Sequence, residues 1–345
     1  MRLGIDFGTT RTVVAGVDRG VHPVLEFEDH AGGAHGFFPT VVALAAGRLV
    51  FGFEALEAGR RGAPVLRSFT HLLGDPVLQA DSTASVGSRE VPLVDLLAAY
   101  LRDVRDRLPV DPGEVAVSVP AHAPDTRRHL TLEAFRAADF AVVATIDEPS
   151  AAAFEYTHRH ARSLTARRSQ IGVFDLGGDT FDASLLDARG GQPAVLETRR
   201  VPRLGSDDFD RILVDLVLAR VGAWREALEP AVLENLEGQC RAALERLTPQ
   251  TRRIAVDVHG DQVVVPVDEL WAAIGPLVER CLAEMDPLVG VLDRDSSVAG
   301  ISLVGSGSRL PLVSRLARER YGSRVHRSPH PSAATAIGLA ISIDR

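Results

Sequence analysis

Lysine is missing from this chain of 345 residues, because arginine accounts for all 38 of its lysine and arginine positions. Chemistry that depends on a side-chain ammonium group, such as a Schiff base, is therefore excluded. Biased codon usage is the simplest explanation of the absence. Cysteine is scarce as well: Cys240 and Cys281 are the only two. Two cysteines form no disulfide framework and suit a reducing compartment.

Long apolar runs are also lacking. No run approaches the roughly 20 residues that a membrane-spanning helix needs. The N-terminus reads "MRLGIDFGTT", and its acid at position 6 interrupts the apolar core that a signal peptide requires. We therefore expect a cytoplasmic protein without a membrane partner. The formal net charge of −8 argues against binding to duplex nucleic acid, which needs a basic face.

Two hairpin-like segments stand out among what is present. Near the N-terminus, "RLGID" precedes a Gly-Thr turn and the returning strand "TVVAGVD". In the second half, "IGVFD" precedes a Gly-rich turn and "FDASLLD". An acid-ended strand, a turn and a returning strand thus occur once in each half. This duplication predicts two related lobes, and the length of the chain agrees with that division.

The segments between and after the hairpins mix strands and helices. We predict strands over 114–120 and 141–149, a hairpin over 253–267 turning at His259, and a strand, turn and helix over 298–322. Helices are expected over 125–140 and over 149–160 with Pro149 in its first turn, and a turn followed by a helix is expected over 204–220. The predicted class is therefore α/β in two lobes.

The acid-tipped turns suggest phosphate chemistry. Phosphates are held by backbone N–H groups in turns, by helix N-termini and by a metal ion. Magnesium keeps most of its waters and needs only a few carboxylates, which Asp6 and Asp175 could supply. Either turn alone favours a structural hairpin, but their repetition favours a phosphate site. Asp179, in the middle of the second turn, opposes this interpretation, because its negative charge would repel a phosphate.

Two further places have a structural and a functional interpretation. The turn "GSGSRLP" at 305–311 follows a predicted strand and opens a helix. It could cap that helix, or it could approach an adenosine closely, with Arg309 over the base or ribose. Glu148 ends a predicted strand just before Pro149. It could stabilise the helix N-terminus, or it could position an attacking water.

Six segments in order resemble the nucleotide-binding domain of DnaK-type heat-shock 70 chaperones, within the actin and sugar-kinase superfamily. They are "GIDFGTTRTVVA", "VSVPAHAPDTRRHLTLEAFRAADF", "IDEPSAAAFEY", "VFDLGGDTFDASLL", "LGSDDFD" and "LVGSGSRLP". The resemblance covers nearly the whole chain. It implies an actin-like ATPase fold, in which each lobe has a mixed five-stranded sheet flanked by helices and a nucleotide cleft lies between the lobes. The lobes would be residues 1–165, with a small subdomain near 36–90, and residues 166–345, with one near 206–280.

The resemblance also implies ATP or ADP with Mg²⁺ between the lobes, and it assigns roles to individual positions. For metal contact through water it implies Asp6 and Asp175. For the phosphate loops and other nucleotide contacts it implies Gly8, Thr9, Thr10, Gly177, Gly178, Asp179, Gly205, Gly305, Ser306 and Arg309. For catalysis it implies Glu148, Asp182 and Thr180, the two acids orienting the hydrolytic water. For a switch that relays the nucleotide state it implies Pro120 and Arg128.

Three departures from the family pattern all touch the nucleotide. Thr70 stands at the apparent place of the catalytic lysine, with Arg67 and His71 nearby as the available substitutes. Asp179 replaces a third glycine, and a like charge about 4 Å from a phosphate oxygen costs on the order of 4 kcal/mol at an effective dielectric near 20. The basic adenosine-clamping positions fall near Leu244 and Glu245, next to Arg246. We therefore expect weak ATP binding and slow or absent hydrolysis, as in a weak ATPase or a nucleotide-binding pseudo-enzyme.

Three functions remain open at this point. The leading one is a stand-alone ATP-responsive module, because the chain ends where the family's peptide-binding domain would follow. Such a module would be a monomer that signals to a separate, unidentified protein partner by lobe closure. The alternatives are a filament-forming relative of bacterial actin and, less favoured, a small-molecule kinase such as a sugar kinase.

Overall fold

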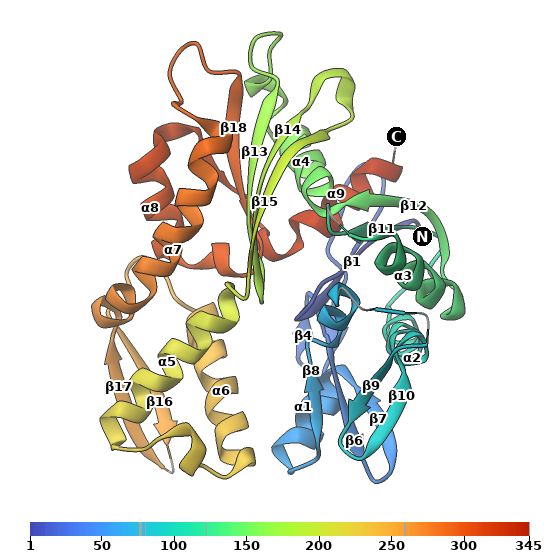
Figure 1. Cartoon of the computed structure of the whole chain (residues 1–345), viewed down its shortest axis with the longest axis vertical. Coiled ribbons are helices and arrows are strands. Elements are labelled where there is room, and N and C mark those ends of the chain that lie inside the picture. Colours follow the sequence, from blue (N-terminus) through green and yellow to red (C-terminus); the bar gives the residue numbers. More distant parts are fainter. Residues whose placement is uncertain (76–77, 80, 122, 259, 345) are drawn as a thin grey trace. The chain divides into compact units, whose positions relative to one another are not determined.

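The computed structural model describes residues 1–75, 78–79, 81–121, 123–258 and 260–344 (Figure 1). It divides into two compact units. The first consists of Met1–Ala161 together with the segment from Ala333 onward, and the second of Arg162–Ser332. His259, at the expected turn of the 253–267 hairpin, lies outside the described residues.

The first unit is built on a five-stranded sheet of order β12-β11-β1-β2-β5. Its strands are β1 (Leu3–Phe7), β2 (Arg11–Gly16), β5 (Phe38–Pro39), β11 (Glu114–Val119) and β12 (Ala141–Asp147). The second unit is built on a sheet of order β15-β14-β13-β18-β19. Its strands are β13 (Gln170–Leu176), β14 (Thr180–Asp187), β15 (Ala194–Pro202), β18 (Val298–Val304) and β19 (Val325–Arg327).

The two sheets share one pairing pattern. In the first, β1 is antiparallel to β2 and parallel to β11, which is parallel to β12. In the second, β13 is antiparallel to β14 and parallel to β18, which is parallel to β19. Each sheet ends on a third antiparallel strand, β5 or β15. The α/β class and the duplication predicted from the two hairpins are therefore confirmed.

Helices and small sheets complete each unit. The helices of the first unit are α1 (Gly52–Arg60), α2 (Leu93–Asp106), α3 (Asp125–Ala137), α4 (Glu148–Arg159) and α9 (Ala334–Ile343). Its small sheets are the pair β3 (Phe27–Glu28) and β4 (Ala34–His35), the triplet β6 (Val41–Ala45), β7 (Arg48–Phe51) and β8 (Val65–Arg67), and the pair β9 (Thr83–Val86) and β10 (Arg89–Pro92). In the second these are α5 (Ser206–Val221), α6 (Pro230–Glu245), α7 (Val267–Val289), α8 (Pro311–Tyr321), and the pair β16 (Arg253–Val258) and β17 (Asp261–Pro266). In Figure 1, α5, α6, β16 and β17 gather at one end of the second unit.

The C-terminal helix α9 belongs to the first unit, although the sequence expectation placed residues up to 345 in the second lobe. The helix packs against α4, β1, β2 and β11. Small residues permit this close packing: a Cβ atom on Gly338 would lie 1.7 Å from the Ala151 carbonyl oxygen. Arg2 also contacts the Ile343 carbonyl and the Asp344 carboxylate at the end of the helix. The local sequence of an apolar segment does not indicate which sheet the segment will cover. This explains why the sequence-based expectation placed the segment in the wrong lobe.

Each unit has its own hydrophobic core. In the first, aromatic side chains such as Phe38, Phe135 and Tyr100 are fully buried between the sheet and its helices. In the second, Phe174, Phe181 and Phe209 are buried in the same way.

None of the helices in the described residues combines the length and apolar character needed to cross a bilayer.

Candidate functional site

Asp6 lies near the carboxyl end of β1, beside the ends of two parallel strands. Its carboxylate accepts a 2.7 Å hydrogen bond from the Ser118 hydroxyl on β11. Burial raises the pKa of Asp6 to about 6, against the lowering effect of that hydrogen bond. The next parallel strand, β12, ends at Asp147, and Glu148 begins α4. The carboxyl ends of parallel strands share one sheet edge, so Asp6 and Glu148 belong to the same edge.

The turn that contains Gly8, Thr9 and Thr10 is held by a residue that the sequence analysis missed. Within the turn, the Gly8 N–H donates to the Arg11 carbonyl at 3.1 Å. Thr40 donates its hydroxyl to the Gly8 carbonyl at 3.0 Å and its N–H to the Thr10 carbonyl at 3.0 Å. Thr40 is itself 2% exposed. Thr40 is far from the turn in sequence, so no local signal identifies it.

Thr70, which the resemblance predicts at the position of the family lysine, lies in a short 3₁₀ helix over Phe69–Gly74. It is 2% exposed, and its hydroxyl has no hydrogen-bond partner among the described residues. His71 is exposed and its ring contacts the Ser68 carbonyl in the same turn. Arg67 ends β8 and is half-buried. The buried Thr70 therefore offers no charge.

The expected switch residues flank one loop. Pro120 follows β11 and its carbonyl accepts the Ala123 N–H at 3.0 Å. Arg128 lies in the first turns of α3 and forms a 3.5 Å ion pair with Asp147, the last residue of β12. The Asp147 contact links Arg128 to the residue directly before Glu148. A switching role for these residues stays a prediction.

The second hairpin places its two acids side by side. Asp175 on β13 and Asp182 on β14 are paired in the antiparallel register. The turn between them closes through the Gly177 N–H, which donates to the Thr180 carbonyl at 2.9 Å. Asp179, within this turn, is partly exposed.

Asp182 is already engaged by an arginine. Arg200 on β15 donates from Nε to Oδ1 at 2.8 Å and from Nη2 to Oδ2 at 3.0 Å. Both oxygens of the expected water-orienting acid thus accept hydrogen bonds from one guanidinium group. The contact depends on the register between β14 and β15, which the sequence does not reveal.

The N-terminus of α5 is docked under the second turn. The Ser206 and Asp207 N–H groups donate to the Gly177 and Gly178 carbonyls, each at 2.9 Å. A Cβ atom on Gly205 would lie only 2.2 Å from the Gly178 carbonyl oxygen, so only glycine permits this approach. Two of the free N–H groups of the helix therefore bind the loop itself.

The 305–309 turn also meets the second hairpin. Gly305 has φ +85°, and a Cβ atom there would lie 2.3 Å from the Leu176 carbonyl oxygen. The hydroxyls of Ser306 and Ser206 are 2.9 Å apart. Arg309 is exposed and contacts the Glu245 carbonyl at 3.4 Å. The structure thus brings the 175–180, 205–206 and 305–309 segments together.

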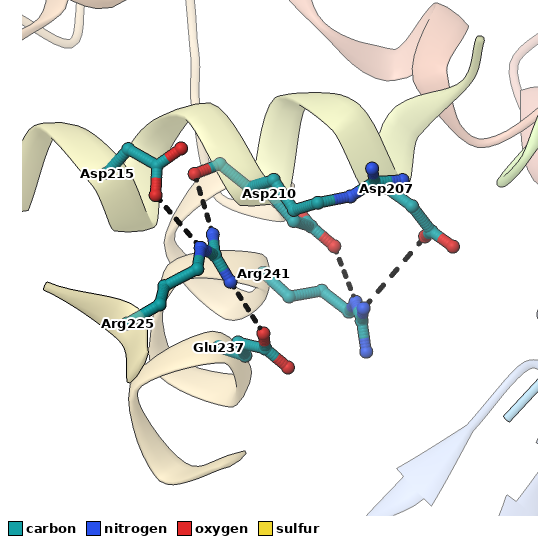
Figure 2. Close-up of polar contacts among 7 residues, drawn as sticks. Asp207, Asp210, Asp215, Arg225, Glu237 and Arg241 are labelled. Carbon is teal, nitrogen blue, oxygen red and sulfur yellow. Dashed lines mark hydrogen bonds and ion pairs between the residues drawn. The ribbon is translucent and has the colours of Figure 1, made fainter. Parts of the chain in front are cut away.

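The sequence analysis did not name Arg241 on α6, whose contacts with the acids of α5 are shown in Figure 2. Arg241 forms ion pairs with Asp210 at 2.7 Å and Asp207 at 3.9 Å, joining α6 to α5. Leu244, by contrast, is buried in the core, and Arg246 is exposed beyond the helix end. Arg241 precedes Leu244 by one helical turn. A search for a basic residue one turn before the expected position would therefore have identified it.

A second arginine, Arg225, reinforces the same helix pair. It contacts Asp215 and Glu237, each at 2.9 Å.

Burial raises the pKa of Asp207 to about 6, with Arg241 lowering it and the charges of Asp210 and Asp179 raising it. The start of α5 is therefore a site where carboxylates are crowded and only partly neutralised.

The predicted residues fall into two groups, one at the corresponding strand ends of each sheet. Within the first unit lie Asp6, Gly8, Thr9, Thr10, Pro120, Arg128 and Glu148; within the second lie Asp175, Gly177, Gly178, Asp179, Thr180, Asp182, Gly205, Gly305, Ser306 and Arg309. No group of three or more His, Cys, Asp or Glu side chains in the described part of the chain could hold a metal ion. Magnesium bound mainly through water and phosphate needs only one or two carboxylates, and Asp6 in the first unit and Asp175 in the second are each of that chemical type.

Comparison with known proteins defines the class. A family model described as Hsp70 protein matches residues 96–344. The chain therefore belongs to the Hsp70 family, and its two five-stranded mixed sheets flanked by helices confirm the predicted actin-like ATPase fold.

Individual relatives are chaperones of one type. The chain is 32% identical over 368 residues to the chaperone protein HscA of Edwardsiella ictaluri (strain 93-146), an alignment covering 99% of this chain and 57% of that protein. It is 30% identical over 378 residues to the chaperone protein HscA homolog of Burkholderia pseudomallei (strain 668), covering 100% of this chain and 58% of the relative. The chain thus spans less than two thirds of the length of these relatives.

Proposed function

We propose that this chain binds ATP and ADP with Mg²⁺ through its two hairpins and responds to the bound nucleotide. The observation that carries the proposal is the convergence of the 175–180, 205–206 and 305–309 segments at one end of the second sheet. The equivalent end of the first sheet carries Asp6 and the Gly8–Thr10 turn. Family membership favours this function over an actin-like filament or a sugar kinase.

The roles of individual residues follow from their placement. Asp6 and Asp175 would hold the hydrated Mg²⁺, which supplies charge neutralisation at the phosphates when bound. N–H groups of the two turns other than those of Gly8 and Gly177, which donate within the turns, would contact phosphate oxygens, and Arg309 would face the adenosine. Glu148 and Asp182 would orient the attacking water.

Slow hydrolysis is part of the proposal. Thr70 is neutral and buried where the family has a lysine, so the developing charge loses one source of stabilisation. Asp182 is held by Arg200 on both oxygens, which reduces its ability to orient water. Single-turnover hydrolysis of Mg-ATP should therefore be orders of magnitude slower than in a lysine-bearing Hsp70 assayed in parallel. Equal rates would refute this part of the proposal.

Thermal unfolding with added nucleotide tests binding directly. At a nucleotide concentration 100 times Kd, the native state should gain about 2.7 kcal/mol. Asp175→Asn should weaken this effect for Mg-ATP. Asp215→Asn is the matched control, because Asp215 lies on α5 and is 64% exposed. A wild-type chain that neither ATP nor ADP stabilises would contradict the proposal.

The partner is proposed to be a protein, which reads the nucleotide state through closure of the lobes. The support is that the relatives are named chaperones. We expect a monomer with Mg-ATP in analytical ultracentrifugation. Nucleotide-dependent polymers would favour the filament alternative instead.

A further inference from the structure

Three charged side chains stand in a row across the second sheet. The β13–β14 register pairs Asp175 with Asp182, and the β14–β15 register pairs Asp182 with Arg200. Residues that are paired directly across antiparallel strands project from the same face of a sheet. Asp175, Asp182 and Arg200 therefore form one row, which we call the charged row, a few residues from the 177–180 turn.

Without Arg200, the charged row would carry the two negative charges of Asp175 and Asp182. Two carboxylates directly opposite one another repel. Arg200 binds both oxygens of Asp182 in the bidentate geometry that is strongest for a guanidinium group, and arginine stays charged throughout the accessible pH range. The Asp182 side chain is 14% exposed and that of Arg200 34%, so their attraction is screened less than that of a fully exposed pair. The row thus carries one net negative charge instead of two.

We infer that Arg200 is an internal counter-cation of the second hairpin, taking over part of the neutralisation that a divalent cation otherwise supplies at a phosphate site. A divalent cation is attracted less to the charged row than to two uncompensated carboxylates. A nucleotide phosphate without metal is also repelled less by the charged row than by two uncompensated carboxylates. The inference rests on the proposed function in one respect: it makes nucleotide binding less dependent on Mg²⁺.

The chain offers a matched control at the adjacent position. Arg199 also lies on β15, and alternate residues of a strand project from opposite faces. It forms ion pairs with Glu197 at 3.2 Å and Glu284 at 3.8 Å. Arg199→Ala therefore removes the same charge from the same strand without altering the charged row.

The first experiment uses the metal alone and needs no nucleotide. Mn²⁺ binding to the full chain is measured by electron paramagnetic resonance for wild type, Arg200→Ala, Arg199→Ala and the double variant Asp182→Asn/Arg200→Ala. We expect Arg200→Ala to bind Mn²⁺ about 10-fold more tightly than wild type, because a unit negative charge is uncovered beside the ion. The double variant, with the same net row charge as wild type, should return to the wild-type affinity. Equal affinity of wild type and Arg200→Ala, or an equal gain in Arg199→Ala, would overturn the inference.

The second experiment measures ADP affinity with Mg²⁺ and with EDTA. The ratio of the two affinities should be about 10-fold larger in Arg200→Ala than in wild type, because loss of the counter-cation weakens the metal-free complex most. Arg200→Gln, which keeps a long polar side chain, should behave like Arg200→Ala. An unchanged ratio would count against the inference. A wild type that binds no ADP in either condition would contradict the proposed function, and the Mn²⁺ measurement would still decide the role of Arg200.

Discussion

The two hairpins share a topology but are supported differently. The first turn is held by one distant residue, because Thr40 donates its hydroxyl to the Gly8 carbonyl and its backbone N–H to the Thr10 carbonyl. The second turn rests on a helix, because the N–H groups of Ser206 and Asp207 donate to its carbonyls. The second arrangement places the backbone of Gly205 directly against the Gly178 carbonyl, where a Cβ atom would lie only 2.2 Å from the oxygen, and so tolerates less change. A duplicated strand pattern therefore preserves the position of the acids without preserving what holds them.

Glycine substitutions should separate the hairpins most strongly. In Gly205→Ala the new Cβ would lie 2.2 Å from the Gly178 carbonyl oxygen, and we expect a loss of about 3 kcal/mol or more in the free energy of unfolding. Gly8→Ala, whose Cβ would lie 2.7 Å from the Arg11 carbonyl oxygen, should cost less. Urea unfolding measures both.

Gly238→Ala is the control for these variants. A Cβ atom there meets nothing within 4 Å inside α6, so we expect a gain of about 0.5–1 kcal/mol from the lower flexibility of alanine. If Gly205→Ala were as harmless as Gly238→Ala, the docking of the second turn on α5 would be wrong.

The support of the first turn can be removed through its side chain. Thr40→Val deletes the hydroxyl that donates to Gly8 and leaves that carbonyl without it, which should cost about 2 kcal/mol. Nucleotide affinity should fall as well, because the turn loosens. Unfolding and ADP titration of the same variant test both effects. Unaltered values in the two assays would show that the Thr40 hydroxyl does not hold the turn.

The crowded start of α5 predicts a pH dependence. The pKa of Asp207 is about 6 in the folded chain and about 3.9 when unfolded, so the unfolded chain loses this proton first. The contribution of Asp207 to the free energy of unfolding should therefore fall as pH rises from about 4 to about 6. Asp207→Asn removes this contribution, so its stability relative to wild type should grow across that window by about 2 kcal/mol.

Asp215→Asn on the same helix is the control for this titration, since its carboxylate is largely exposed. Chemical unfolding at pH 4, 5, 6 and 7 gives the comparison. A difference between Asp207→Asn and wild type that does not vary with pH would contradict the burial of the Asp207 carboxylate.

The smallest expected effect concerns Thr70. Its buried hydroxyl lacks a partner among the described residues, so Thr70→Val should be neutral or stabilising by up to about 1 kcal/mol. Thr12→Val provides a contrast in the same unit, because the Thr12 hydroxyl accepts a 2.8 Å hydrogen bond from Tyr100. Thr12→Val should destabilise. A loss in Thr70→Val as large as that in Thr12→Val would mean that the Thr70 hydroxyl has a partner after all.

The sequence predicted what is encoded locally. Asp6 and Asp175 are the next-to-last residues of strands that precede glycine-containing turns, and this pattern was enough to predict both hairpins and their duplication. The position of α9 was wrong because an apolar segment does not specify which sheet it covers. Thr40, Arg200 and Arg241 were missed because their contacts depend on strand register and helix packing between distant residues. The meeting of the two hairpins around one nucleotide stays a prediction.

The most direct test is a double-mutant cycle on the affinity for Mg-ADP, with Asp6→Asn, Asp175→Asn and both together. If both carboxylates hold the same hydrated metal ion, each single variant loses affinity and the double variant loses clearly less than the sum of the two free-energy changes. Affinity equal to wild type in either single variant, or strictly additive losses, would contradict a shared nucleotide site.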